Sequence, residues 1–276
     1  MTYRDFWHHL TSVYDEGEAK AVARMVYEVR FGLSWTDLCI GKDTQLSADN
    51  QTELQEILQR LLQKEPVQYV LGQADFCGRT FLVNSHVLIP RPETEELVQW
   101  LLETHSSPSG ETEGGDILDI GTGSGNIAIT LAASIPNAHV TAWDISPEAL
   151  AIAKKNAERH HVSVTFQQVD ALDSSLLTII SNPPYIADHE RGTMSPNVLD
   201  YEPHTALFVP DEDPLRFYRA IAAYGQQALL PGGWLYFEIN PLYVNELCEL
   251  LRMMRFHRIE TKEDQFGKQR FIRAQR

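Results

Sequence analysis

The chain contains the segment Asp116-Ile-Leu-Asp-Ile-Gly-Thr-Gly-Ser-Gly-Asn126, in which a short apolar run meets three closely spaced glycines. A short apolar run of this kind indicates a buried strand, and the glycines predict a turn into a helix. Glycine takes up backbone angles barred to other residues and lets a ligand approach the main chain. The first N–H groups of the helix lack helical partners, so they can bind the anionic end of that ligand. The segment therefore predicts a strand, a ligand-binding turn and a helix.

Strand and helix patterns alternate from this segment to the C-terminus. Strands are expected at 116–120, 139–143, 163–168, 177–181 and 233–239, and helices at 125–134, 147–160, 214–229 and 241–254. Such alternation is typical of a parallel sheet covered on both faces. The tail predicts two more strands, at 256–259 and 269–274, around a turn at Phe266-Gly267. We therefore expect an α/β fold with a doubly wound, mostly parallel sheet that ends in an antiparallel C-terminal strand.

The residues before this region have a different pattern. Apolar residues recur at helical spacing at Val22, Met25, Val26 and Val29, and again at 54–62, so residues 1–66 are predicted to form a small helical domain. Gly78 and the apolar residues around it predict a β-hairpin linker at 67–92. Residues 93–276 are then expected to form the second, larger domain.

Composition limits the class of protein. The formal net charge is -15 and the pI is about 5.0, which disfavours a general nucleic-acid binder because such a surface repels phosphates. The three cysteines are far apart, which favours reduced thiols, and the ten histidines have no metal-ligand spacing, so no metal is expected. No apolar run is long enough to span a membrane, and no secretion signal is visible. We expect a cytoplasmic protein.

A second motif, Ser181-Asn-Pro-Pro-Tyr185, follows the apolar run at 176–180. Because Pro184 holds Pro183 extended, the Pro183 carbonyl is free to accept a hydrogen bond from a ligand. Asn182 adds a second acceptor, and Tyr185 adds a ring that can stack on a planar group. Two acceptors beside a ring suit a planar –NH2 group, although an isolated motif of this type can also be a plain turn after a core strand.

The glycine-rich turn is compatible with two classes of cofactor. A dinucleotide site requires a third glycine where this chain has Asn126. The spacing instead resembles the loop that binds methionine and ribose in S-adenosylmethionine-dependent methyltransferases. Asp144 ends the next strand and can accept both ribose hydroxyls of either cofactor class. Asp170 ends the third strand, where the adenine amine would lie.

Together the two motifs resemble those of amino-methyltransferases of the S-adenosylmethionine class. Three further segments, Leu88-Ile-Pro-Arg-Pro-Glu-Thr-Glu95, Gln68-Tyr-Val-Leu-Gly72 and Tyr201-Glu-Pro203, make the chain similar to the bacterial release-factor glutamine methyltransferases, the HemK family. This resemblance implies a Rossmann-like class I methyltransferase sheet behind a helical domain that docks the substrate. It also implies methylation of the glutamine amide in the Gly-Gly-Gln loop of peptide chain release factors, with S-adenosyl-L-homocysteine as product.

The resemblance also implies roles for individual residues. Cofactor contacts fall on Gly121, Thr122, Gly123, Ser124, Gly125, Asp144, Asp170, Ala171 and Asn182, and substrate contacts on Asn182, Pro183, Pro184 and Tyr185, of which Asn182, Pro183 and Tyr185 are catalytic. Many family members carry an aromatic residue where this chain has Ala171. The implied partner is a release factor, with no direct nucleic acid, no membrane and a monomeric chain.

The hypothesis for the mechanism is that Asn182 and the Pro183 carbonyl accept the two amide protons while Tyr185 packs on the amide plane. Glu93 and Glu238 can approach the site and are interpreted as structural. Three alternatives stay open. They are a glutamine methyltransferase acting on a ribosomal protein, an enzyme that methylates the amino group of adenine or cytosine, and a catalytically inert fold. The acidic charge disfavours the nucleobase enzyme.

Overall fold

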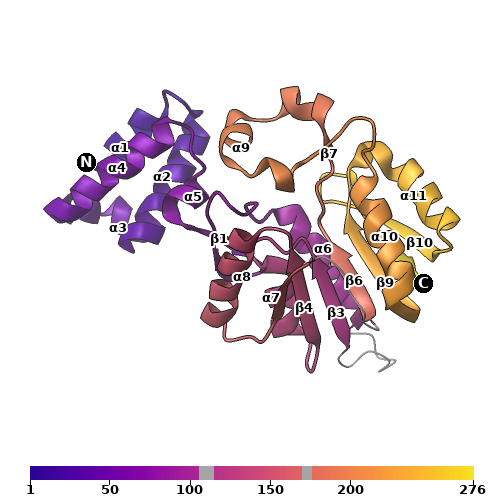
Figure 1. Cartoon of the computed structure of the whole chain (residues 1–276). Coiled ribbons are helices and arrows are strands. Elements are labelled where there is room, and N and C mark those ends of the chain that lie inside the picture. Colours follow the sequence, from indigo (N-terminus) through magenta and orange to yellow (C-terminus); the bar gives the residue numbers. More distant parts are fainter. Residues whose placement is uncertain (106–114, 170–175) are drawn as a thin grey trace. The chain divides into compact units, whose positions relative to one another are not determined.

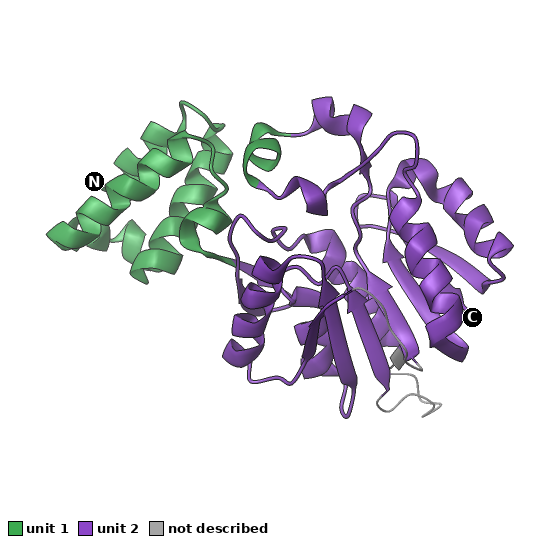
Figure 2. Cartoon of the chain, in the orientation of Figure 1, with its two compact units in different colours: residues 1–73, 195–201 green, residues 74–194, 202–276 purple. Residues whose placement is uncertain are grey.

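A computed structural model describes residues 1–105, 115–169 and 176–276 of the chain. The chain divides into two compact units, drawn in two colours in Figure 2. The first contains residues 1–73 and 195–201, and the second contains residues 74–194 and 202–276. The chain therefore passes between the units at three points, after residues 73, 194 and 201.

The first unit is helical, as predicted for the N-terminal region. Its elements are α1 (Tyr3–Leu10), α2 (Glu16–Phe31), α3 (Trp35–Cys39), η1 (Lys42–Gln45), α4 (Ala48–Leu62), α5 (Val67–Leu71) and, from a distant part of the chain, α9 (Pro196–Tyr201). Ser47 caps α4 by accepting a hydrogen bond from Asn50 N. The unit has a hydrophobic core of its own, which includes Phe6, Tyr27 and Leu61. The Tyr201 hydroxyl donates to the Gln63 carbonyl at 2.9 Å.

The second unit is built on a seven-stranded sheet in the order β10-β11-β9-β6-β3-β4-β5. The strands are β3 (Asp116–Ile120), β4 (His139–Asp144), β5 (Thr165–Gln168), β6 (Leu176–Ser181), β9 (Leu229–Glu238), β10 (His257–Glu263) and β11 (Gln269–Gln275). β11 pairs antiparallel with β9 and β10, and the other pairs are parallel. The predicted mostly parallel α/β fold with an antiparallel C-terminal strand is thus confirmed.

Two strands extend four residues beyond a predicted end. β9 begins at Leu229 instead of 233, because Leu229 pairs with Leu176 ahead of a register shift in this part of the strand. The sequence did not predict this extension because it contains Pro231-Gly232-Gly233, and proline and glycine are unusual inside a strand except at an irregularity. β10 continues to Glu263 instead of ending at 259, because its pairing with β11 extends to the pair Glu263 and Gln269.

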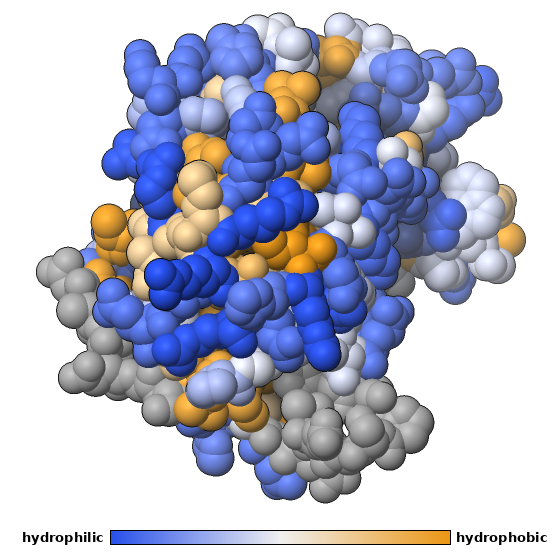
Figure 3. All heavy atoms as spheres, turned by 90° about the vertical axis from the view of Figure 1, so that its right-hand side faces the viewer, coloured by the Kyte–Doolittle hydropathy of each residue, from blue (hydrophilic) through white to orange (hydrophobic). Residues whose placement is uncertain are grey.

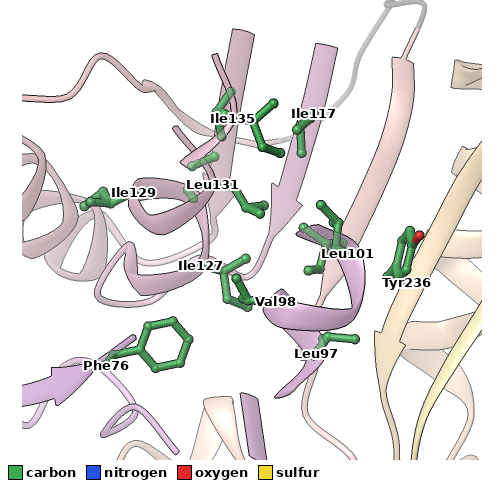
Figure 4. Packing of buried hydrophobic residues seen from close by; sticks show 14 of the residues in the cluster. Phe76, Leu97, Val98, Leu101, Ile117, Ile127, Ile129, Leu131, Ile135 and Tyr236 are labelled. Atoms are coloured by element: carbon green, nitrogen blue, oxygen red, sulfur yellow. The ribbon is translucent and has the colours of Figure 1, made fainter. Parts of the chain in front are cut away.

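Helices cover both faces of the sheet (Figure 1). These are α6 (Pro92–His105), α7 (Asn126–Ser134), α8 (Pro147–Arg159), α10 (Arg216–Ala228) and α11 (Val244–Met253). Neighbouring strand residues point to opposite faces, so Ile117 packs in the cluster of α6 and α7 while Leu118 packs in the cluster of α10 and α11. In Figure 4, Leu97, Val98 and Leu101 of α6 lie between the side chains of α7 and Tyr236 of β9.

A hairpin precedes the sheet. Its strands β1 (Gln73–Phe76) and β2 (Arg79–Leu82) are joined by Cys77-Gly78. Both turn residues have positive φ, 47° and 71°, which is the backbone geometry that favours tight two-residue hairpin turns. The interval 67–92 thus contains α5, this hairpin and the first residue of α6.

The remaining elements are short. A two-stranded parallel sheet is formed by β7 (Ile186–Ala187) and β8 (Phe208–Val209), and 3₁₀ turns occur at η2 (Asp188–Thr193), η3 (His204–Ala206) and η4 (Pro241–Tyr243). On the face of the molecule drawn in Figure 3, hydrophilic residues predominate and hydrophobic ones form small patches between them. Among the helices of the described ranges, none is long and apolar enough to cross a bilayer.

Candidate active site

The glycine-rich turn and the Asn-Pro-Pro-Tyr turn follow two neighbouring strands. β3 and β6 are parallel, and their last paired residues are Ile120 and Ser181. The Ser181 hydroxyl donates to the Ile120 carbonyl at 2.6 Å, which ties the two strand ends together. From β3 the chain moves to β4 on one side, whereas β6 lies on the other side. Ligands of open α/β sheets bind at such a switch point, beyond the carboxyl ends of the strands.

The three glycines of the first turn all have positive φ, 78° at Gly121, 54° at Gly123 and 82° at Gly125. A Cβ built on Gly121 or Gly123 would meet no described atom within 4 Å, so both border open space. A Cβ on Gly125 would lie 3.1 Å from Ala153 Cβ of α8. Gly125 is therefore required for helix packing, and the other two leave room for a ligand.

The polar side chains of the glycine-rich turn are buried and form hydrogen bonds to other residues of the protein. Thr122 is 2% exposed, and its hydroxyl donates to Asp119 Oδ2 at 2.6 Å. Ser124 is 1% exposed, and its hydroxyl donates to Asn126 Oδ1 at 3.2 Å. Any contact of Thr122 or Ser124 with a cofactor would thus fall on their main chain.

Asn156 of α8 anchors the glycine-rich turn through hydrogen bonds. Its Nδ2 donates to the Ser124 carbonyl at 2.8 Å and to the Leu82 carbonyl at 3.0 Å. Leu82 N donates back to Asn156 Oδ1 at 2.7 Å. One buried amide thus connects the glycine turn, α8 and the hairpin strand β2. The sequence analysis did not identify Asn156, since an asparagine within a helix gives no signal of its partners.

Asp119 is a second residue that the sequence analysis missed. Its Oδ2 accepts hydrogen bonds from Thr122 Oγ1 and from Ala128 N, the latter at 3.2 Å. Its Oδ1 is buried and has no hydrogen-bond partner among the described residues. Burial raises the pKa of Asp119 to about 7. An acid in a buried strand, two residues before the first glycine, was the signal available in the sequence.

Asp144 lies at the end of β4, as expected. Its Oδ2 accepts from Gly123 N at 2.8 Å and its Oδ1 accepts from Ser146 N at 2.9 Å. Each carboxylate oxygen can accept a further hydrogen bond, so the side chain can still receive hydroxyl donors. The predicted cofactor residues Asp170 and Ala171 lie outside the described residues.

The second turn is held by a network of side chains. Asn182 Nδ2 donates to Thr94 Oγ1 at 3.1 Å, and Thr94 Oγ1 donates to Glu238 Oε2 at 2.6 Å. The Tyr185 hydroxyl donates to Glu238 Oε1 at 2.9 Å. Thr94 comes from α6 and Glu238 from the end of β9, so three distant parts of the sequence meet here. Thr94 was quoted in a motif but received no role.

The charge of Glu238 is set by opposing effects. Burial raises the pKa of this carboxyl, whereas the hydrogen bonds from Thr94 and Tyr185 and the charge of Arg270 lower it. The net direction is upward, and the nearby Glu93 adds to it. Burial, followed by the charge of Glu238, also raises the pKa of Tyr185 well above its ordinary value. The phenol therefore stays protonated and serves as a donor.

Two further contacts fix the surroundings. Asn240 Nδ2 donates to the Tyr185 carbonyl at 3.1 Å and to Glu190 Oε2 at 2.8 Å. The buried Glu202 pairs with Arg91 and accepts from Ile89 N at 3.2 Å. The segment that leads into α6 is thereby held on the segment that follows α9. The arrangement as a whole combines open space at Gly121 and Gly123 with a neighbouring turn that carries hydrogen-bond acceptors.

Comparison with known proteins gives consistent results. The family model described as "Methyltransferase small domain" matches residues 95–199, and the one described as "PrmC N-terminal domain" matches residues 8–72. A release factor glutamine methyltransferase of Bacteroides thetaiotaomicron is 46% identical over 97% of this chain and 96% of its own length. The enzyme of that name from Flavobacterium psychrophilum is 41% identical over 98% and 96%. That of Streptococcus pneumoniae is 38% identical over 93% and 92%.

Solved structures share the fold at low sequence identity. A methyltransferase of Pyrococcus furiosus superposes with a TM-score of 0.53 and 16% identity, covering 83% of this chain and 98% of its own. A T. Thermophilus 16S rRNA methyltransferase, solved with AdoMet and guanosine, has a TM-score of 0.53 and 18% identity. It covers 74% of this chain and 49% of its own. Both are methyltransferases by name, and the likeness is one of fold.

Proposed function

Because this chain belongs to the family of release factor glutamine methyltransferases, we propose that it methylates a glutamine of peptide chain release factors. The methylated atom is the side-chain amide nitrogen in the Gly-Gly-Gln loop, and the methyl donor is S-adenosylmethionine. The observation that carries the proposal is the position of the hydrogen-bonded Asn182. It directly follows Ser181, whose hydroxyl donates to the carbonyl of Ile120, and Ile120 is the residue before the glycine turn.

The residues of the glycine turn fit this cofactor. Asp119 Oδ1 is a buried acceptor without a partner among the described residues, and the amino group of the methionine part would satisfy it. Asp144 has acceptor capacity left for ribose hydroxyls, and Gly121 and Gly123 leave the space open. When bound, S-adenosylmethionine supplies a methyl carbon made electrophilic by a positively charged sulfur.

The acceptor turn prepares the nucleophile. An amide nitrogen attacks poorly because its lone pair is delocalised into the carbonyl group. Asn182 Oδ1 and the Pro183 carbonyl accept hydrogen bonds from the two N–H groups of the substrate amide, and Tyr185 packs on the plane of that amide. These fixed dipoles orient the nitrogen and favour the positive charge that develops on it. The bond between the methyl carbon and sulfur would break as the N–C bond forms, leaving a neutral thioether, and the extra proton would then leave to water, so no general base is needed before transfer.

The domain roles follow from the same assignment. Residues 1–66 dock the release factor, residues 67–92 link the two domains, and residues 93–276 bind cofactor and glutamine. The enzyme acts as a monomer in the cytoplasm. Its formal charge of -15 suits a protein substrate better than a phosphate backbone, which disfavours adenine or cytosine as acceptor. A glutamine on a ribosomal protein is the second candidate, because the same acceptor turn would bind it.

The test is methyl transfer from labelled S-adenosylmethionine to purified release factor, with the modified residue located by mass spectrometry. We expect one methyl group on the glutamine and none on a release factor that carries alanine there. Ribosomal proteins and nucleic acid, offered in parallel, should stay unlabelled. Label on either of them, without label on the release factor, would replace the proposal with the corresponding alternative.

A further inference from the structure

We propose that Thr94 is a positioning residue that sets which end of the Asn182 amide faces the substrate, and so makes the site select a carboxamide over a carboxylate. The inference rests on the proposed function, since it concerns how glutamine is distinguished from glutamate. It begins from the hydrogen-bond chain that leads from Asn182 through Thr94 to Glu238.

The direction of each hydrogen bond in this chain follows from Glu238. Glu238 accepts a hydrogen bond on each of its oxygens, from Thr94 Oγ1 at 2.6 Å and from the Tyr185 hydroxyl at 2.9 Å. The single hydroxyl proton of Thr94 is then committed to Glu238. Thr94 Oγ1 therefore meets Asn182 as an acceptor, and the group that it faces at 3.1 Å must be Nδ2.

This polarity fixes the other end of the side chain. With Nδ2 turned to Thr94, Oδ1 is the end left for the ligand, and no described residue donates a hydrogen bond to it. The two ends of an asparagine amide have nearly the same shape, so the surrounding hydrogen bonds decide its orientation. Rotation of the amide by half a turn would aim Nδ2 at the ligand. It would then meet the –NH2 of glutamine donor to donor, but would suit the carboxylate of glutamate.

The burial of Thr94 and Glu238 strengthens their hold on the orientation of the Asn182 amide. Thr94 is 3% exposed and Glu238 is 1% exposed, so water does not readily replace the hydroxyl. Thr94 is held at the start of α6 by a hydrogen bond from its own N–H to the Arg91 carbonyl at 3.1 Å. Thr94 lies 88 positions before Asn182, and Glu238 lies 144 positions after Thr94, so the fold alone brings the three residues together.

The experiment compares Thr94→Val, Thr94→Ser and a matched control in the full chain. Valine keeps the shape of threonine but can neither donate nor accept, whereas serine keeps the hydroxyl. The control is Thr130→Val in α7, because Thr130 is 1% exposed and its Oγ1 has no partner among the described residues. The measurements are kcat and KM with release factor, the Kd of S-adenosylmethionine, and inhibition by a release factor with glutamate in place of the glutamine.

In Thr94→Val we expect kcat to fall by about 10- to 100-fold, because a misdirected amide no longer orients the nitrogen. The Kd of S-adenosylmethionine should stay within about twofold of wild type, and Thr94→Ser should recover most of the lost kcat. The second readout is the ratio of the inhibition constant of the glutamate-containing release factor to the KM of the glutamine-containing one. This ratio should be about tenfold lower in Thr94→Val than in wild type. Thr130→Val should behave as wild type in every measurement.

The outcomes separate the two claims. Unchanged kcat and unchanged glutamate inhibition in Thr94→Val, with an active wild-type enzyme, overturn the positioning role and leave the proposed function standing. A loss of kcat with the same relative inhibition by glutamate assigns Thr94 to structure and also overturns it. If the wild-type enzyme methylates no release factor, the proposed function fails and the selectivity claim fails with it.

Discussion

The two turns at the active edge of the sheet are built in opposite ways. The glycine turn after β3 offers main chain and open space, and its side chains Thr122 and Ser124 are turned to internal partners. The turn after β6 has prolines in place of glycines, and its Asn182 and Tyr185 side chains donate hydrogen bonds to side chains of α6 and β9. Under the proposed function, the first turn would therefore select its ligand mainly by the open space beside the main chain. The second turn would select its ligand by the direction of hydrogen bonds, which depends on side chains from distant parts of the sequence.

Asn182→Ala tests the second turn most directly. Removal of an oriented acceptor at the reacting nitrogen should lower kcat by about 10²- to 10³-fold, as for other preorganised groups. The glycine turn is untouched, so the Kd of S-adenosylmethionine, measured by calorimetry, should stay within about threefold of wild type. A large loss of cofactor affinity instead would mean that the two turns are not separate in function.

Gly123→Val tests the first turn. The side chain would occupy the space that Gly123 leaves open, so cofactor affinity should fall by about 100-fold, near 2.7 kcal/mol. The matched control is Gly267→Val, in the turn between β10 and β11, where φ is 76° and the space is also open. Both variants place a β-branched residue at positive φ, but only Gly123→Val should lose affinity for the cofactor. Equal affinities for the two variants would show that the opening at Gly123 holds no ligand.

Gly125→Ala tests whether Gly125 serves helix packing, in contrast to Gly121 and Gly123, which border open space. Its Cβ would press on α8, 3.1 Å from Ala153 Cβ, which adds overpacking to the strain of positive φ. We expect urea unfolding to give a free energy about 2 kcal/mol lower than for Gly123→Ala, which has strain alone. If both alanine variants unfold at the same urea concentration, Gly125 is not a packing residue.

The effect of Asp119→Asn on stability should be visible in its pH dependence. The pKa of Asp119 is about 7 in the folded protein against an ordinary value of 3.8. Its contribution to stability is therefore complete below pH 3.8 and is lost as the pH rises through 7. Between pH 5 and 7 the wild type should lose up to about 1.4 kcal/mol per pH unit relative to Asp119→Asn. Thermal melts of both proteins across this range provide the measurement, and parallel curves would contradict the raised pKa.

The contrast between the turns also explains what could be predicted from sequence. Gly121 to Gly125 form one continuous segment after an apolar strand, so local rules placed the turn at the edge of a parallel sheet. The position of Asn182, directly after a strand of the same sheet, was predicted for the same reason. Glu238 was expected near the site, but the hydrogen bond from Asn182 to Thr94 was not predicted, because these residues lie far apart in the chain and meet only through the strand order. Asn156 and Asp119 were missed likewise, since their roles depend on which buried atoms lack or share partners.

The three crossings of the chain between the two units limit how the protein can be shortened. A fragment that begins at residue 74 would still carry α9, whose native neighbours lie in the deleted part, among them the Gln63 carbonyl that receives the Tyr201 hydroxyl. Residue 202 follows at once, and its carboxylate holds Arg91. To isolate the second unit, residues 195–201 should therefore be replaced with a short polar connection that preserves Glu202, because a cut at a single boundary would leave α9 without its neighbours.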